Sequence, residues 1–235
     1  MPTKLILALD TKDPTEAINI VDEFHSIVKY FKVGSILYTL SGNKIIEHIQ
    51  SRNASVFLDL KFFDIPNTVK GAASVVTGLG VQMFTIHLMG GREMIRASLE
   101  GILEETEKNH WKEKPLALGV TLLTSLNEKI LNEELKINLS LKDMILHLAK
   151  MGYEEGIRGF VCSPEEIRLL KDKLGEKITI VTPGIRLKGD SLGDQKRVLT
   201  PREASRLGAD YIVAGRSILN KPDRIKAVEE ILKEL

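Results

Sequence analysis

Short apolar runs alternate with longer, helix-like segments along the whole chain of 235 residues. The short runs have the length of buried strands, and the segments between them repeat apolar residues at helical spacing. The strands predicted in this way span residues 5–9, 31–33, 56–60, 83–87, 116–121, 159–162, 178–181 and 211–214. We therefore expect strands and helices to alternate from one end of the chain to the other.

The clearest predicted helix start is Asp13-Pro14, an N-cap residue followed by proline at the first helical position. A second helix is expected to start at Ser163-Pro164. Repeated strand–helix units, without a linker or a break in composition, predict a single α/β domain over residues 1–235, a (β/α)8 TIM barrel. A doubly wound open sheet is the alternative fold.

Two stretches interrupt this alternation. Residues 122–143 indicate a loop with a short helix before the next full helix. Residues 182–200 are polar and contain glycines, which is typical of a mobile active-site loop. A solvated linker is the alternative for this second stretch, but its length inside a compact barrel favours a function.

The charge balance and the length of the apolar runs argue against nucleic acid and membranes as partners. The chain has 33 Lys and Arg against 32 Asp and Glu, so it lacks the basic field that would hold nucleic acid or an anionic membrane. No apolar run approaches the ~20 residues of a membrane span, and the N-terminal run is too short for a signal peptide. We expect a cytoplasmic protein, in which the single cysteine, Cys162, is a buried structural thiol.

Charged residues gather at the ends of the first three predicted strands. Strand alternation places Asp59 and Lys61 on one face of the strand, where they could form a structural ion pair or the charged floor of a catalytic site. Asp10 ends the first strand, and Lys32 lies in the second. Because parallel neighbours lie about 4.8 Å apart, the four side chains could form one row. That row would lie at the mouth where barrel enzymes place their chemistry.

The end of the chain adds a candidate phosphate site. Gly215 and Arg216 follow the last predicted strand in "DYIVAGRS", and Arg186 follows the seventh in "TPGIR". Glycine lets the backbone approach a phosphate group closely, and an arginine guanidinium can form bidentate hydrogen bonds to two phosphate oxygens. "DYIVAGRS" alone is equally compatible with an ordinary turn, but the two stretches together favour a phosphorylated small molecule as ligand.

These stretches resemble the orotidine 5′-phosphate decarboxylase family, and the resemblance covers nearly the whole chain. It rests on "LALD", "FKVG", the Asp-x-Lys-x-x-Asp motif of Asp59, Lys61 and Asp64, "TLLTS", "TPGIR" and "GADYIVAGRSI". The resemblance implies a (β/α)8 barrel that acts as a homodimer. It also implies decarboxylation of orotidine 5′-monophosphate to UMP without a cofactor or a metal ion.

The resemblance further implies a role for each matched residue. Lys61 resembles the proton donor to C6, Asp59 the carboxylate beside the substrate carboxylate, and Asp64 an aspartate that reaches into the partner subunit's site. Asp10 resembles the ribose-binding aspartate, and Lys32 resembles a lysine, both catalytic and substrate-binding, that joins the ribose contact to the charged row. The other implied substrate contacts are Ile65 and Thr68 beside Asp64, Thr124 or Ser125 at the pyrimidine, and Arg186, Gln195, Gly215 and Arg216 at the phosphate.

Two other functions remain open at this point. A metal-dependent sugar-phosphate lyase or aldolase of the same superfamily also carries the Asp-x-Lys-x-x-Asp motif. Such relatives resemble "EVG" where this chain has Lys32, whose ammonium would repel a magnesium ion. A non-catalytic barrel that binds a phosphorylated metabolite would have no need of the charged row. His87 and Trp111 are interpreted as structural residues.

Overall fold

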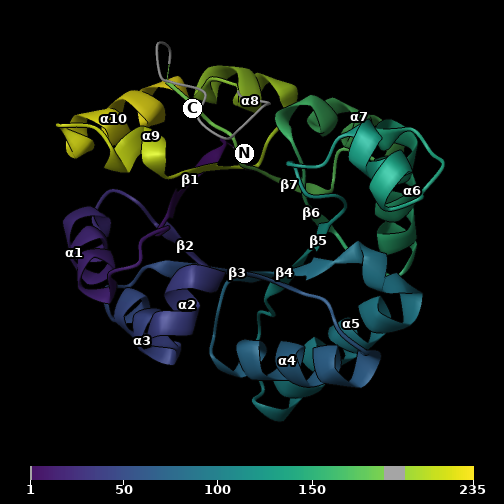
Figure 1. Ribbon diagram of the computed structural model, residues 1–235. Helices are drawn as coiled ribbons and strands as arrows, with labels where there is room; N and C mark the ends of the chain where they lie inside the picture. The colour runs from purple at the N-terminus through teal and green to yellow at the C-terminus, as the bar shows by residue number, and fades with distance from the viewer. Residues whose placement is uncertain (1, 188–198) are drawn as a thin grey trace.

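The computed structural model describes residues 2–187 and 199–235 and shows a closed barrel of parallel strands, each beside its neighbour in sequence (Figure 1). The strands are β1 (Lys4–Ala8), β2 (Tyr30–Gly34), β3 (Ser55–Phe62), β4 (Met83–His87), β5 (Leu116–Val120), β6 (Gly159–Val161), β7 (Thr179–Thr182) and β8 (Tyr211–Ala214). The closed order confirms the predicted TIM barrel and excludes an open doubly wound sheet.

The helices lie around the outside of the barrel (Figure 1). They are α1 (Pro14–Phe24), α2 (Ser35–Ser41), α3 (Asn43–Ser51), α4 (Pro66–Gly78), α5 (Gly91–Lys108), α6 (Leu141–Glu154), α7 (Ile167–Leu174), α8 (Pro201–Leu207), α9 (Arg216–Leu219) and α10 (Arg224–Glu234). Within the two described ranges, no helix combines the length and the apolar character needed to cross a membrane.

Local sequence signals place most of the element ends. All the predicted strands are present, and their ends agree with the prediction to within one or two residues. Helix α1 begins at Pro14 as predicted, because the side chain of Asp13 accepts a 2.8 Å hydrogen bond from the backbone N–H of Thr15. The start predicted at Ser163-Pro164 is instead a 3₁₀ turn, Pro164–Glu166, which leads into α7.

The strands separate two apolar layers. Side chains that point inward form a small cluster in the barrel: Ile6, Ala8, Phe57, Met83, Leu118, Val181 and Val213. A larger cluster fills the space between the strands and the helices. In the strand register Lys32 pairs with Ala8 on one side and Phe57 on the other. Because paired residues of a parallel sheet share a face, the side chain of Lys32 points into the barrel with its two neighbours.

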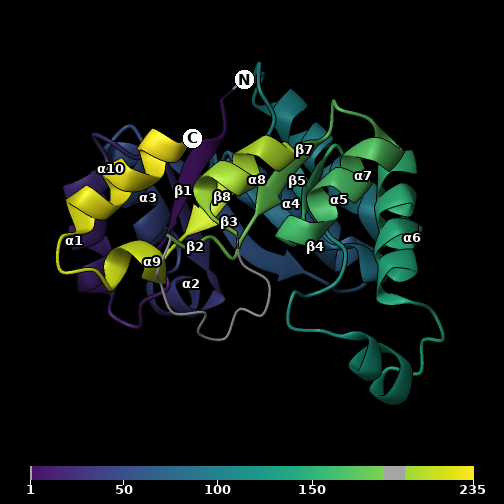
Figure 2. The ribbon, with the colours of Figure 1, turned by 90° about the horizontal axis from the view of Figure 1, so that it is seen from above.

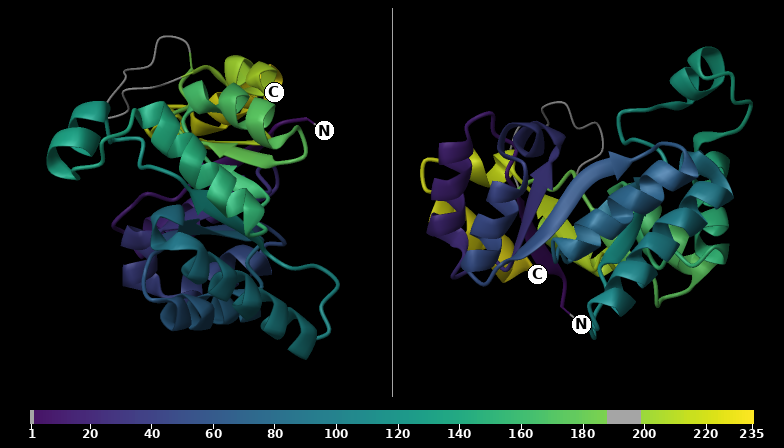
Figure 3. Two further views of the ribbon diagram at one scale, coloured as in Figure 1. Left: turned by 90° about the vertical axis from the view of Figure 1, so that its right-hand side faces the viewer. Right: turned by 90° about the horizontal axis from the view of Figure 1, so that it is seen from below.

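The connection between β5 and α6 projects from the body of the barrel (Figures 2 and 3). It contains a short π-helix, Ile130–Glu134, in agreement with the predicted loop and short helix. Leu131 in this turn is buried, and the side-chain amide of Asn132 donates hydrogen bonds of 2.6 and 2.9 Å to the carbonyl oxygens of Ile137 and Leu139. The connection therefore has a defined conformation, held by hydrogen bonds within it and by Leu131, which belongs to the larger apolar cluster.

The predicted loop 182–200 is described only at its two ends. These ends meet in a parallel bridge between Ile185 and Leu199. The middle of the loop, including Gln195, lies outside the described residues.

Candidate active site

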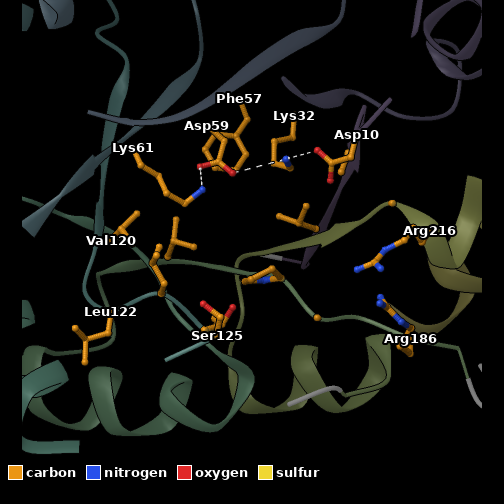
Figure 4. A pocket seen from close by; sticks show the side chains of 18 residues that line it. Asp10, Lys32, Phe57, Asp59, Lys61, Val120, Leu122, Ser125, Arg186 and Arg216 are labelled. Carbon is orange, nitrogen blue, oxygen red and sulfur yellow. Dashed lines mark hydrogen bonds and ion pairs between the residues drawn. The ribbon is translucent and has the colours of Figure 1, made fainter. Parts of the chain in front are cut away.

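Four charged side chains from the first three strands lie in one row at the carboxyl end of the barrel. The ammonium of Lys32 lies 2.8 Å from Asp10 Oδ1 and 3.7 Å from Asp59 Oδ2. The ammonium of Lys61 lies 2.9 Å from Asp59 Oδ1. The charges thus alternate in the order Asp10, Lys32, Asp59, Lys61, as the strand ends predicted (Figure 4).

Lys32 is the most deeply buried charge of this row. It is 9% exposed, and burying an ammonium so far is costly unless anions compensate it. Asp10 and Asp59 flank it and supply that compensation. Gly34, which ends β2, leaves the space for this contact, because a Cβ atom there would lie 3.2 Å from Lys32 Nζ.

Asp59 lies between the two ammonium groups and keeps its negative charge. Burial of its carboxylate favours the neutral form, but the charges of Lys32 and Lys61 and hydrogen bonds from Lys61 and Thr85 outweigh burial. Together they hold the pKa of Asp59 below its ordinary value.

Strand β3 is not regular where it carries these charges. Its pairing with β4 shifts between Leu58, which pairs with Phe84, and Phe62, which pairs with Ile86. Lys61 has a φ of +52°, a left-handed conformation that costs a non-glycine residue about 1–3 kcal/mol. The prediction that plain alternation places Asp59 and Lys61 together was therefore incomplete, because a bulge contributes to the direction of Lys61.

A cavity of about 310 Å³ lies over the charged row. Its wall includes Asp10, Lys32, Asp59, Lys61, Thr124, Ser125, Arg186, Gly215 and Arg216. In Figure 4 the guanidinium groups of Arg186 and Arg216 point toward each other on the Asp10 side of the cavity, and Lys61 lies on the opposite side. The two arginines could bind an anion at one end of a ligand whose other end reaches Lys61.

Gly215 brings the backbone close to this wall. A Cβ atom at this position would lie 3.2 Å from Ala8 Cβ and 4.0 Å from Asp10 Oδ2, so a side chain would crowd β1. The glycine therefore allows close packing between the ends of β8 and β1 beside the two arginines.

Thr124 and Ser125 enter the cavity from the projecting β5–α6 connection. The sequence left open which of them faces the ligand, and the structure brings both to the wall. Leu122 and Leu123 of the same connection also line the cavity. Both lie in the "TLLTS" motif, but no contact with a ligand had been predicted for either.

Asp64, Ile65 and Thr68 lie outside this cavity on the exposed surface that follows β3. The carboxylate of Asp64 accepts a 2.6 Å hydrogen bond from the backbone N–H of Ile65. Ile65 is 67% exposed, and its neighbour Phe63 is 60% exposed. Asp64 thus does not line the cavity that Lys61 lines, and it lies beside exposed apolar side chains.

His87, Cys162 and Trp111 were interpreted as structural residues, and none of them lines the cavity. His87 is mostly buried, with Nδ1 accepting a hydrogen bond from the N–H of Met89 and its ring 5.4 Å from that of Phe63. Its burial and the charge of Lys61 lower the pKa of His87. Burial raises the pKa of the Cys162 thiol, which suits an unreactive core residue. Trp111 is partly exposed.

Thr85 was not among the site residues predicted from the sequence. Its hydroxyl contacts both Asp59 and the backbone of Lys61, at distances of 3.0 and 2.8 Å. A single hydroxyl in the apolar run "MFTIH" was the only signal in the sequence. Among residues 2–187 and 199–235, no group of three or more His, Cys, Asp or Glu side chains is arranged to hold a metal ion.

The chain is similar to known proteins over nearly its whole length. The family model described as "Orotidine 5'-phosphate decarboxylase / HUMPS family" matches residues 3–231. The chain is 43% identical to the orotidine 5′-phosphate decarboxylase of Carboxydothermus hydrogenoformans over 100% of this chain and 97% of that protein. It is 40% identical to the orotidine 5′-phosphate decarboxylase of Dictyoglomus turgidum, over 98% of this chain and 94% of that protein.

Solved structures show the same likeness. The crystal structure of orotidine 5′-phosphate decarboxylase from Lactobacillus acidophilus has a TM-score of 0.86 and 32% identity to this chain. The match covers 100% of this chain and 99% of that chain.

Proposed function

Because this chain belongs to the orotidine 5′-phosphate decarboxylase / HUMPS family, we propose that it decarboxylates orotidine 5′-monophosphate to UMP without a cofactor or metal ion. This reaction is a step of de novo pyrimidine biosynthesis. The observation that carries the proposal is the unbroken row of Asp10, Lys32, Asp59 and Lys61 along one wall of the cavity.

Lys61 is the residue that meets the reacting carbon in this proposal. Loss of carbon dioxide from C6 leaves an electron pair in the plane of the pyrimidine ring, where the π electrons of the ring cannot delocalise it. A fixed ammonium stabilises this charge as it develops and then donates a proton to C6. The strained backbone of Lys61 and its ion pair with Asp59 hold the ammonium in one direction.

Asp59 and Lys32 are proposed to hold the Lys61 ammonium in position for the reaction. Asp59 accepts from Lys61 at 2.9 Å and lies beside the position proposed for the substrate carboxylate. Lys32 balances the charge of Asp59 and links it to Asp10, the proposed ribose contact. The row therefore supplies electrostatic stabilisation that needs little rearrangement during the reaction.

The phosphate is proposed to bind at the opposite end, between Arg186 and Arg216 and beside the backbone of Gly215. Gln195, the remaining proposed phosphate contact, lies outside the described residues. Binding the phosphate far from C6 allows its binding energy to help position the pyrimidine over Lys61.

Thr124 or Ser125 would contact the pyrimidine from the projecting connection.

Arg216→Ala tests the phosphate end. We expect this variant to raise KM by about 10-fold to 100-fold, because a charge-assisted hydrogen bond to phosphate contributes about 1.5–3 kcal/mol. The measurement is steady-state kinetics with the variant Arg202→Ala, a change on α8 away from the cavity wall, as the control. Equal KM values for Arg216→Ala and the wild type would remove Arg216 from the phosphate site.

Asp64 is proposed to act across a homodimer, reaching the Lys61 of the partner subunit. Its position outside the cavity of its own chain and the exposed Phe63 and Ile65 on either side of it support this proposal. Ile65 and Thr68 would accompany it into the neighbouring site. A contiguous exposed apolar patch with polar residues at its rim is typical of a surface that becomes buried in a complex.

The metal-dependent lyase is disfavoured by the surroundings of Lys32. Its ammonium lies between the carboxylates of Asp10 and Asp59, in the place where a divalent cation would need their charge. Lys32 thus supplies from the chain itself the positive charge that a metal would contribute there.

An assay in excess EDTA tests the proposed reaction directly. We expect the purified protein to convert orotidine 5′-monophosphate to UMP at the same rate with EDTA and with added magnesium, followed by ultraviolet absorbance. A folded protein that converts no substrate under either condition would overturn the decarboxylase proposal. Turnover only with magnesium would instead favour a metal-dependent enzyme.

A further inference from the structure

The hydroxyl of Thr85 joins two residues of the charged row from the neighbouring strand. Thr85 lies in the middle of β4 and has no exposed surface. Its Oγ1 accepts a 2.8 Å hydrogen bond from the backbone N–H of Lys61 and donates a 3.0 Å hydrogen bond to Asp59 Oδ1. One buried hydroxyl therefore contacts the backbone of the proposed proton donor and the carboxylate that holds its ammonium.

The bulge in β3 explains why a side chain is needed here. Three residues of β3, at positions 59 to 61, lie between the pairs Leu58–Phe84 and Phe62–Ile86, and they face the single residue Thr85 of β4. A bulge interrupts the backbone hydrogen bonds between two strands. The N–H of Lys61 finds its acceptor in the Thr85 side chain, at the residue whose φ is +52°.

The same hydroxyl fixes the direction of the Asp59 carboxylate. Asp59 Oδ1 accepts from Thr85 Oγ1 at 3.0 Å and from Lys61 Nζ at 2.9 Å. Because a hydroxyl carries a single hydrogen, donation to Asp59 leaves its lone pairs to accept from the N–H of Lys61. Both hydrogen bonds can therefore form at once, and each makes the geometry of the other more definite.

We propose that Thr85 is a positioning residue for the decarboxylation, holding the bulge at Lys61 and the rotamer of Asp59 in register with each other. The inference rests on the proposed function of Lys61 and Asp59. Thr85 is not among the residues that line the cavity, so it acts through these two residues and not through the substrate. Its removal should affect the chemical step more than binding.

Thr85→Val and Thr85→Ser separate the hydroxyl from the volume of the side chain. Valine keeps the shape and removes both hydrogen bonds, whereas serine keeps the hydroxyl. We expect Thr85→Val to lower kcat by about 100-fold, since a misplacement near 1 Å at a reacting group can have that effect. KM and the affinity for UMP should stay close to wild type, and Thr85→Ser should recover most of the lost kcat.

Thr77→Val is the matched control. Thr77 is equally buried, in α4, and its hydroxyl donates a 2.7 Å hydrogen bond to the carbonyl of Ala73, away from the cavity. Its kcat should stay at the wild-type value. Thr85→Ala serves as a second variant if valine beside the Asp59 carboxylate prevents folding, and it should show the same loss of kcat.

Amide exchange gives a readout that does not depend on turnover. In protein labelled with ¹⁵N-lysine, the Lys61 amide, assigned by loss of its signal in Lys61→Arg, should exchange slowly in the wild type. It should exchange faster in Thr85→Val or Thr85→Ala, while other lysine amides keep their rates. A fast-exchanging Lys61 amide in the wild type would overturn the inference.

The outcomes also distinguish this inference from the proposed function. A wild-type protein without decarboxylase activity would refute the proposed function, whatever the amide data show. An active wild type together with wild-type kcat in Thr85→Val or Thr85→Ala would refute only the positioning role. Equal losses in Thr85→Val and Thr77→Val would indicate a general effect on stability and would equally overturn it.

Discussion

Replacing Lys61 with alanine is expected to lower kcat by a factor of about 10⁴ or more, because the variant loses both the stabilising charge and the proton donor at C6. The same change leaves Asp59 with Lys32 and Thr85 as its remaining partners. Lys61 is also partly exposed, with 38% of its side-chain surface accessible, so its removal should not unfold the barrel. The measurement is kcat by ultraviolet absorbance, with circular dichroism and thermal unfolding to establish the folded state.

Lys44→Ala is the control for the loss of a lysine. Lys44 lies exposed on α3 and does not line the cavity, so this variant should retain wild-type kcat. Lys61→Ala should still bind UMP, since the proposed phosphate contacts lie at the other end of the cavity. A Lys61→Ala protein with near-wild-type turnover would remove Lys61 from the proposed role.

Mixing two inactive variants is expected to restore activity if Asp64 acts across the dimer. Asp64→Ala alone should lower kcat by about 10²-fold to 10³-fold through loss of a carboxylate near the reacting groups. In a dimer of one Asp64→Ala and one Lys61→Ala subunit, one site has lost both side chains and the other has kept both. Random exchange of equal amounts should therefore recover about one quarter of the wild-type activity.

The exchange itself needs an independent check. Subunits with different affinity tags allow the hybrid dimers to be isolated and counted before the assay. Hybrid dimers that stay inactive would show that Asp64 acts within its own chain or not at all. Lys44→Ala mixed with Lys61→Ala provides the comparison, because each Lys44→Ala subunit supplies an intact Lys61 and Asp64.

Much of the fold follows from local properties of the chain. Apolar periodicity predicted each strand, and the Asp13-Pro14 pair predicted the start of α1, because these signals act over a few neighbouring residues. The ends of several strands differ by one or two residues, since the last backbone hydrogen bonds depend on the neighbouring strand. The 3₁₀ turn before α7 is a similar local difference.

The sequence by itself determined the barrel and the identities of its charged residues: Asp10, Lys32, Asp59 and Lys61 stand at strand ends, and parallel strands bring their ends together. Only the tertiary structure decided how these charges meet. The pairing of β3 with β4 produced the bulge that directs Lys61, and it brought the hydroxyl of Thr85 within hydrogen-bond distance of the Lys61 backbone. The loop after β3 placed Asp64 outside the cavity of its own chain. Strand register and loop direction depend on contacts between residues far apart in the sequence, so no local pattern specifies them.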